Sequence, residues 1–107
     1  MGRDVSKEKR KALNARILLT MTYAIRFSRS AKKDIRRIPN TILHRIQNAM
    51  DELRTNPLQD GYEPIRGYEH CYRIRIGNYR VIYELASTIR IITIIRIGHR
   101  QNVYREL

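Results

Sequence analysis

Three arginines in one short segment have the spacing needed to bind an anion together. Residues 71–85 read CYRIRIGNYRVIYEL, and two alternating runs joined by a Gly-Asn pair predict a β-hairpin with a two-residue turn. In that register Arg75 faces Arg80 directly, and Arg73 shares their side of the sheet. Directly opposed like charges destabilise a hairpin by a few tenths of a kcal/mol up to about 1 kcal/mol. We therefore predict an anion between these side chains, and phosphate suits the planar guanidinium group.

A second basic cluster follows the last predicted strand. Residues 96–104 read RIGHRQNVY and contain Arg96, His99, Arg100 and Tyr104. Consecutive antiparallel strands are usually neighbours, so the end of this strand is expected near the arginine face of the hairpin. The sequence thus predicts a concave basic site that also holds an imidazole and a phenol.

Such a site has most of the groups needed to cleave RNA through its own 2′-hydroxyl. The reaction needs a proton acceptor, positive charge around the phosphorane and a proton donor for the departing 5′-oxygen. Arginines supply only the charge, because guanidinium keeps its proton in proteins. His99 can accept or donate a proton, and Tyr104 can stack on a base or, beside guanidinium groups, accept a proton. The alternative is that exposed arginines simply splay apart and that His99 is a surface residue.

Charge and composition favour a nucleic-acid partner. The chain has 107 residues, room for one domain, and a net charge of +12. Of its 22 basic residues 17 are arginine, which points to a polyanion, although a merely soluble basic surface is the alternative. The single Cys71 has no disulfide partner, which favours a reducing, cytoplasmic setting. The apolar run ILLTM is too short for a signal peptide or membrane span, and no metal or cofactor site is predicted.

The elements that must position these residues follow from the hydrophobic periodicity. Residues 21–27 alternate as a strand, and two amphipathic helices are expected over residues 28–39 and 40–56. A turn-rich stretch over residues 57–69 precedes the hairpin, and the apolar run over residues 89–97 predicts a third strand. We therefore predict an α+β domain with an N-terminal strand, a two-helix hairpin and a three-stranded antiparallel meander, both helices packing on one sheet face. Ser28 or Ser30 is expected to cap the first helix, with Asp34 near its start.

Alternation assigns one face of the hairpin to the core and leaves the other open to solvent or a ligand. The residues assigned to the core face are Tyr72, Ile74, Ile76, Tyr79, Val81 and Tyr83. Those assigned to the open face are Arg73, Arg75, Arg80, Ile82 and Glu84.

The hairpin and tail motifs resemble those of the RelE/ParE superfamily of toxins from type II toxin–antitoxin modules, and its RelE branch in particular. The motifs are IRGYEHCYRIRIGNYRVIYE over residues 65–84, with Ile65 where leucine is usual, and RIGHRQNVY. The resemblance covers residues 21–107 and implies a RelE-like fold. It also implies a ribosome-dependent endoribonuclease that cuts messenger RNA. Its expected partners are the ribosome, messenger RNA and an acidic RelB-like antitoxin, the toxin alone being a monomer.

The resemblance also implies roles for individual residues. The catalytic positions it marks are Arg73, Arg75, Arg80, Arg100 and Tyr104, with His99 beside them. The best-known RelE toxins have lysines where this chain has Arg73 and Arg75. A related branch has a glutamate base, working with a tail histidine, at the position of Glu63. The general base is therefore left open among Tyr104, His99 and Glu63.

Two further basic regions lie outside the hairpin. Residues 1–20 hold six basic and two acidic residues and are interpreted as an extension, helical or artefactual, before a domain of residues 21–107. Basic residues on the helices can grip ribosomal RNA through salt-sensitive phosphate contacts, although a charge run is often only a solvated helix face. With Arg96, the predicted RNA-binding residues are Lys32, Lys33, Arg36, Arg37 and Arg45.

Two other functions are compatible with these residues. A toxin of the ParE type has a similar fold but poisons DNA gyrase without chemistry of its own, and it need not keep the dense arginine and histidine set. A non-catalytic RNA-binding protein is the second alternative, because no residue of the set is an unambiguous base.

Overall fold

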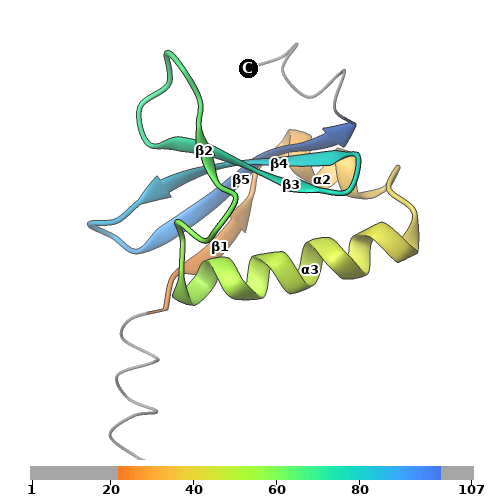
Figure 1. The fold of residues 1–107 in the computed structure, drawn as a ribbon, viewed down its shortest axis with the longest axis horizontal. Helices are drawn as coiled ribbons and strands as arrows, with labels where there is room; N and C mark the ends of the chain where they lie inside the picture. Colours follow the sequence, from red (N-terminus) through yellow and green to blue (C-terminus); the bar gives the residue numbers. More distant parts are fainter. Residues whose placement is uncertain (1–21, 100–107) are drawn as a thin grey trace, which may run out of the picture.

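The computed structural model describes residues 22–99, which form one mixed sheet and two helices (Figure 1). The predicted α+β fold is confirmed, with strand order β1-β5-β4-β3-β2. No helix in this part of the chain is long and apolar enough to cross a membrane. The elements, in chain order, are β1 (Ala24–Phe27), α2 (Arg29–Ile35), α3 (Asn40–Thr55), β2 (Glu63–Pro64), β3 (Cys71–Ile76), β4 (Tyr79–Ala86) and β5 (Ile91–His99).

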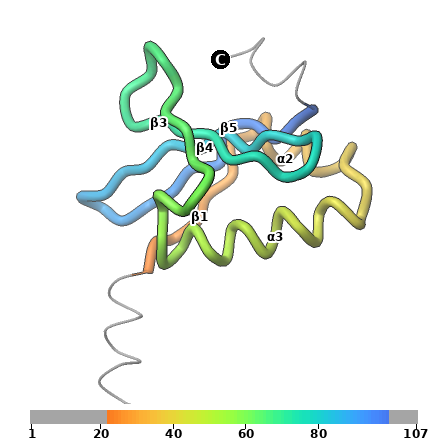
Figure 2. The backbone as a smooth tube through the Cα atoms, in the orientation of Figure 1, coloured from red at the N-terminus to blue at the C-terminus, as the bar shows by residue number. Residues whose placement is uncertain are grey.

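The first and last strands lie side by side, as the chain trace shows (Figure 2). β1 pairs with β5 in parallel, from Ala24 opposite Ile91 to Phe27 opposite Ile94. The other three pairings are antiparallel. Strand β2 was not predicted: its two residues lie in the stretch described as turn-rich, and they pair with Tyr72 and Arg73 of β3.

Ser28 fixes both the start of α2 and its position against the sheet. Its hydroxyl oxygen accepts a hydrogen bond from the Ala31 N–H at 3.0 Å and donates one to the Ile95 carbonyl at 2.6 Å. Of the two predicted caps, Ser28 is therefore the one that is used. The helix ends at Ile35, earlier than predicted, and the chain passes through a turn before it reaches Pro39. Asp34 lies in the last turn, so its predicted place near the start was wrong.

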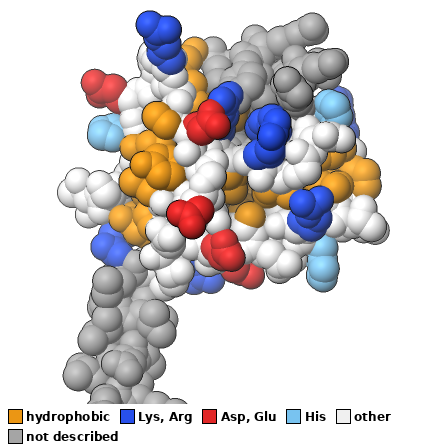
Figure 3. All heavy atoms as spheres, in the orientation of Figure 1, with side chains coloured by type: hydrophobic (Ala, Val, Ile, Leu, Met, Phe, Trp, Pro, Cys, Tyr) orange, Lys and Arg blue, Asp and Glu red, His pale blue; other side chains and the backbone are white. Residues whose placement is uncertain are grey.

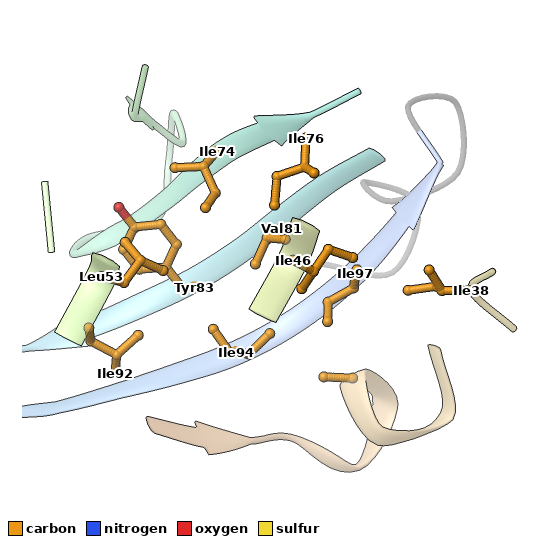
Figure 4. Packing of buried hydrophobic residues seen from close by; sticks show 11 residues of the cluster. Ile38, Ile46, Leu53, Ile74, Ile76, Val81, Tyr83, Ile92, Ile94 and Ile97 are labelled. Atoms are coloured by element: carbon orange, nitrogen blue, oxygen red, sulfur yellow. The ribbon is translucent and has the colours of Figure 1, made fainter. Parts of the chain in front are cut away.

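One core cluster joins both helices to the sheet, as predicted for helices packed on one face (Figure 4). Ala31 and Ile38 come from α2 and the turn after it, and Ile46 and Leu53 come from α3. The sheet contributes Ile74, Ile76, Val81, Tyr83, Ile92, Ile94 and Ile97. Burying branched apolar side chains is the main stabilising term for a sheet of this kind.

A β-bulge in the last strand explains how its side chains divide between the two faces. Tyr83 pairs with Ile94, whereas Ile82 pairs with Arg96, so Ile95 is an extra residue in β5. The spacing of the buried isoleucines in β5 therefore changes from two residues to three before Ile97. This strand begins at Ile91, two residues later than predicted, because residues 87–90 form the turn.

The predicted core face of the hairpin is confirmed, but the opposite face is less open than predicted. Ile82 is fully buried and Arg80 is only 8% exposed. Ile82 lies in a central strand between Arg73 on β3 and Arg96 on β5. The long aliphatic stems of arginine side chains can cover an apolar neighbour. The prediction of an open face is thus wrong at Ile82 and Arg80.

Candidate functional site

The hairpin brings its three arginines into one hollow. The predicted register is confirmed: Arg75 is opposite Arg80 across β3 and β4. Gly77 begins the turn with a φ of 60°, a conformation that glycine adopts without strain. Arg73, Arg75 and Arg80 all line a hollow of about 730 Å³, which we call the arginine hollow.

The arginine hollow lies along the open edge of β3. Because β2 pairs only with Tyr72 and Arg73, the stretch from Ile74 to Ile76 has no strand beside it on that edge among residues 22–99. Ala49 of α3 borders the hollow, as do Gln59, Asp60 and Gly61 from the loop before β2. The hollow therefore has a basic floor and a polar rim that includes two carboxylates, Asp60 and Glu63.

Arg80 is the most enclosed of the three cations. Its side chain lies opposite Gly98 of β5, so no side chain from that strand competes for the space. One of its terminal nitrogens donates a hydrogen bond to the Tyr79 carbonyl at 3.3 Å. A charge this well buried has its orientation fixed before any ligand arrives, which is the arrangement that favours stabilising charge in a transition state.

Arg73 already has an anionic partner within the arginine hollow. Its Nε donates to Oε2 of Glu63 at 3.0 Å, and a terminal nitrogen of Arg73 contacts the same oxygen. The hydrogen bond and the charge of Arg73 lower the pKa of Glu63. Glu63 is therefore ionised throughout the neutral range but has little tendency to take a proton, which makes it a weak general base.

His99 does not line the arginine hollow. It is opposite Tyr79, and the two rings pack edge to face with centroids 5.6 Å apart. With Arg37, Arg96 and Asp34 it lines a separate hollow of about 260 Å³. The predicted single site holding the imidazole beside the hairpin arginines is therefore divided into two within the described part of the chain.

Arg96 is engaged by an acidic residue that sequence reasoning left out of the site. Asp34 accepts hydrogen bonds from Nε of Arg96 at 2.9 Å and from another of its nitrogens at 3.2 Å. The same carboxylate accepts the Ile97 N–H at 2.9 Å. The available signal was local: Asp34 is the single acid in the run KKDIRR, and an isolated carboxylate among cations indicates a specific partner.

The remaining predicted site residues fall into two groups. The predicted RNA-binding residues of the helices and the turn after α2 are all exposed: Lys32, Lys33, Arg36, Arg37 and Arg45. Arg100 and Tyr104 lie outside the described residues. Among residues 22–99, no three His, Cys, Asp or Glu side chains come together as a metal-ligand group.

The sheet topology, the short helix pair and the basic hairpin together define a small toxin fold, and comparison with known proteins agrees. A family described as the ParE toxin of the type II toxin–antitoxin system, parDE, matches residues 25–104, and the chain belongs to this family. The predicted resemblance to the RelE/ParE superfamily is confirmed. Toxin RelG of Mycobacterium tuberculosis is 30% identical over 86 residues, which cover 79% of this chain and 99% of that protein.

Two further relatives place the chain near the RelE toxins. A protein of Escherichia coli named mRNA interferase toxin RelE is 26% identical over 90 residues, covering 80% of this chain and 94% of that protein. The crystal structure of a RelB–RelE antitoxin–toxin complex from Methanococcus jannaschii superimposes with a TM-score of 0.62 and 31% identity, covering 74% of this chain and 94% of that chain.

Proposed function

We propose that this protein is an endoribonuclease toxin that cleaves messenger RNA on the ribosome, through attack of the 2′-hydroxyl on the adjacent phosphate. The observation that carries this proposal is the position of Arg73, Arg75 and Arg80 in one hollow, with Arg75 directly opposite Arg80. An E. coli relative bears the name mRNA interferase, which supports the same activity here.

The arginines have one role in this reaction. Attack by the 2′-oxygen gathers negative charge on the non-bridging oxygens of the phosphate, and fixed guanidinium groups stabilise that charge. Arg80 is held by its burial and its bond to the Tyr79 carbonyl, whereas Arg75 is exposed and can move onto the substrate. Neither residue can act as the base, because guanidinium keeps its proton.

The proton-accepting role is assigned to the tail. We propose Tyr104 as the general base, with Arg100 adding positive charge to the site. Glu63 is a poorer choice because Arg73 lowers its pKa, and the ring of His99 packs against Tyr79, in a different hollow. Guanidinium groups near a tyrosine would lower its pKa, which favours proton acceptance at neutral pH.

The partners proposed are ribosomal RNA and an antitoxin. The exposed cations of α2 and the turn after it, among them Lys32, Lys33 and Arg36, suit sequence-independent phosphate contacts with the ribosome. An acidic antitoxin is proposed because solved relatives are toxin–antitoxin complexes and because the net charge of this chain is +12.

The test is induction of the toxin in cells, followed by mapping of messenger ends. We expect new 5′ ends at codon-defined positions in translated messages. Arg75→Ala should reduce their yield by about 100-fold, the typical cost of losing one fixed transition-state donor. Arg75 is exposed, so its removal should leave the fold intact.

Arg26→Ala is the matched control, because it removes an exposed arginine from β1, at the opposite edge of the sheet from β3. It should keep both growth arrest and cleavage. Intact messages accompanied by DNA damage would instead identify a gyrase poison. Arrest that survives Arg75→Ala unchanged would remove the arginine hollow from the mechanism.

A further inference from the structure

Arg45 of α3 is separated from the other helix cations and lies against the tip of the hairpin. A Cβ atom at Gly77 would lie 3.1 Å from Nη1 of Arg45 and 3.9 Å from its Cζ. The glycine thus serves two ends: it permits the positive φ of the turn, and it leaves room for the guanidinium group to pack over that turn.

Arg45 and Arg75 line a third hollow, of about 310 Å³, between α3 and the hairpin tip. We call it the tip hollow. Asn48 and Glu52 of α3 also line it. Ala49, Arg75 and Ile76 border both this hollow and the arginine hollow, so the two adjoin along the edge of β3.

The cations of the tip hollow are weakly engaged by the described residues, and Arg75 acts on Glu63 only through its charge, as a minor cause of the lowered pKa of that carboxyl. Among residues 22–99, neither Arg45 nor Arg75 makes a hydrogen bond or an ion pair, in contrast to Arg73. Glu52 is the one acid among the described residues that line this hollow, so the two guanidinium groups outnumber it. Both acidic and basic side chains are present on the face seen in Figure 3.

The main-chain N–H of Arg75 faces the open edge of β3, along which the tip hollow lies. The Ile65 N–H donates to the Cys71 carbonyl across β2 and β3, so the peptide groups of Cys71 face the outer edge of β3. The peptide groups of a strand alternate between its two edges, and those of Arg75 therefore also face outward. At Arg75 no strand covers that edge within the described part of the chain, and the N–H is left for a ligand.

We propose that Arg45 and Arg75 form a second phosphate subsite, which holds a nucleotide of the same RNA strand beside the phosphate bound in the arginine hollow. Two guanidinium groups, a main-chain N–H and the Asn48 amide suit the non-bridging oxygens of a phosphodiester. The strand runs along the open edge of β3, across both hollows. This inference rests on the proposed function and specifies where that function grips its substrate.

The test is binding of cleavage-resistant 2′-O-methyl oligoribonucleotides to the full-length protein, measured by fluorescence anisotropy over a range of salt concentrations. Arg45→Ala should weaken binding of a hexanucleotide roughly tenfold, as expected for one lost charge-assisted hydrogen bond. The slope of log affinity against log salt should fall by about 0.7, the value for one phosphate contact on a single strand. A dinucleotide has one phosphate and fills only the arginine hollow. Its affinity for Arg45→Ala should therefore lie within about twofold of its affinity for the wild type.

Two control variants separate the subsite from general charge and from backbone strain. Arg26→Ala removes the same charge at the far edge of the sheet and should keep the slope. Gly77→Ala should weaken hexanucleotide binding less than Arg45→Ala does, because its Cβ only requires the guanidinium group to shift by a few tenths of an ångström and the charge remains. Gly67→Ala imposes similar backbone strain, at a φ of 88°, with nothing within 4 Å of the added carbon, and should keep the slope.

Three outcomes would overturn the subsite. If Arg45→Ala and Arg26→Ala weaken hexanucleotide binding equally, Arg45 acts only through long-range charge. If Arg45→Ala spares the oligonucleotide but weakens binding to purified ribosomes, the guanidinium contacts ribosomal RNA instead. If the wild-type protein cleaves messages in cells but binds no oligonucleotide, the subsite fails while the proposed function stands. Absence of message cleavage by the wild type would contradict the function itself.

Discussion

The arginine hollow contains its own counter-ion at the level of single residues. Glu63 pairs with Arg73 and takes up part of the positive charge that a phosphate would otherwise meet. Both side chains are substantially exposed, 36% for Arg73 and 59% for Glu63, so solvent screens the pair and a ligand can displace it. A phosphate that binds here therefore competes with a carboxylate already in place.

Glu63→Gln should increase affinity for a cleavage-resistant oligoribonucleotide by a few-fold at neutral pH, because the competing charge is gone. Glu63 has a lowered pKa, so it stays charged until the pH falls below the ordinary glutamate range. Wild-type affinity should rise only there, and the stabilising contribution of the Glu63–Arg73 pair should be lost over the same range. The variant should lack this rise. Anisotropy titrations across pH measure the affinities of the wild type and of the variant. A Glu63→Gln protein that binds more tightly but no longer cleaves would identify Glu63 as the base.

At the level of elements, Asp34 joins a short helix to the strand that carries His99. Its carboxylate receives both Arg96 and the Ile97 N–H, at a point where β1 has ended and no longer covers the edge of β5. The side chains of Arg96 and Asp34 are 16% and 12% exposed, so this ion pair is much less screened than the one in the arginine hollow. The contact fixes α2 against the edge of β5.

Asp34→Ala should lower the free energy of unfolding by about 2–4 kcal/mol, because it leaves a partly buried guanidinium and a main-chain N–H without an acceptor. Urea denaturation monitored by circular dichroism measures the change. The matched control is Asp51→Ala on the exposed side of α3, expected to change stability by about 0.5 kcal/mol or less. Equal losses in the two variants would mean that the Asp34 contact adds nothing specific.

For the whole molecule, the core that holds the site together is drawn from a continuous part of the chain. The described core residues and those packed against them run from Tyr23 to Ile97. Residues 1–20, predicted to precede the domain, contribute basic charge at the sequence level. Such charge influences association with polyanions more than it influences folding.

Deleting residues 1–20 should therefore leave the thermal unfolding midpoint within about 2 °C of the full chain, since a change of 1 kcal/mol would shift it by roughly 4–8 °C in a domain of this size. Growth arrest should persist. Deleting residues 1–27 provides the contrast, because it also removes β1 and should abolish folding. A large drop in the midpoint after the shorter deletion would show that the extension is part of the domain.

Sequence reasoning worked where local chemistry decides the structure. The Gly-Asn turn fixes the hairpin register, and Ser28 and the residues before Pro57 bound the helices. Sequence reasoning failed where the structure depends on contacts between segments that are distant in the chain. A two-residue strand such as β2 is too short to give a periodic signal, and the partner of β1 lies at the other end of the domain.

The candidate site likewise has features that local sequence determines and features that distant contacts determine. The cluster of Arg73, Arg75 and Arg80 followed from alternation alone, which is a local property of a hairpin. The separation of His99 from this cluster depends on the order and register of β5 across the sheet, and the engagement of Arg96 depends on where α2 meets that strand. Neither can be read from spacing within one segment.

Parallel pairing of β1 with β5 has a consequence for biosynthesis. Because the two strands are separated by nearly the whole domain, the sheet can close only after the last strand has left the exit tunnel of the synthesising ribosome. A nascent chain whose β5 strand is still inside the tunnel therefore has a hairpin but not a complete sheet.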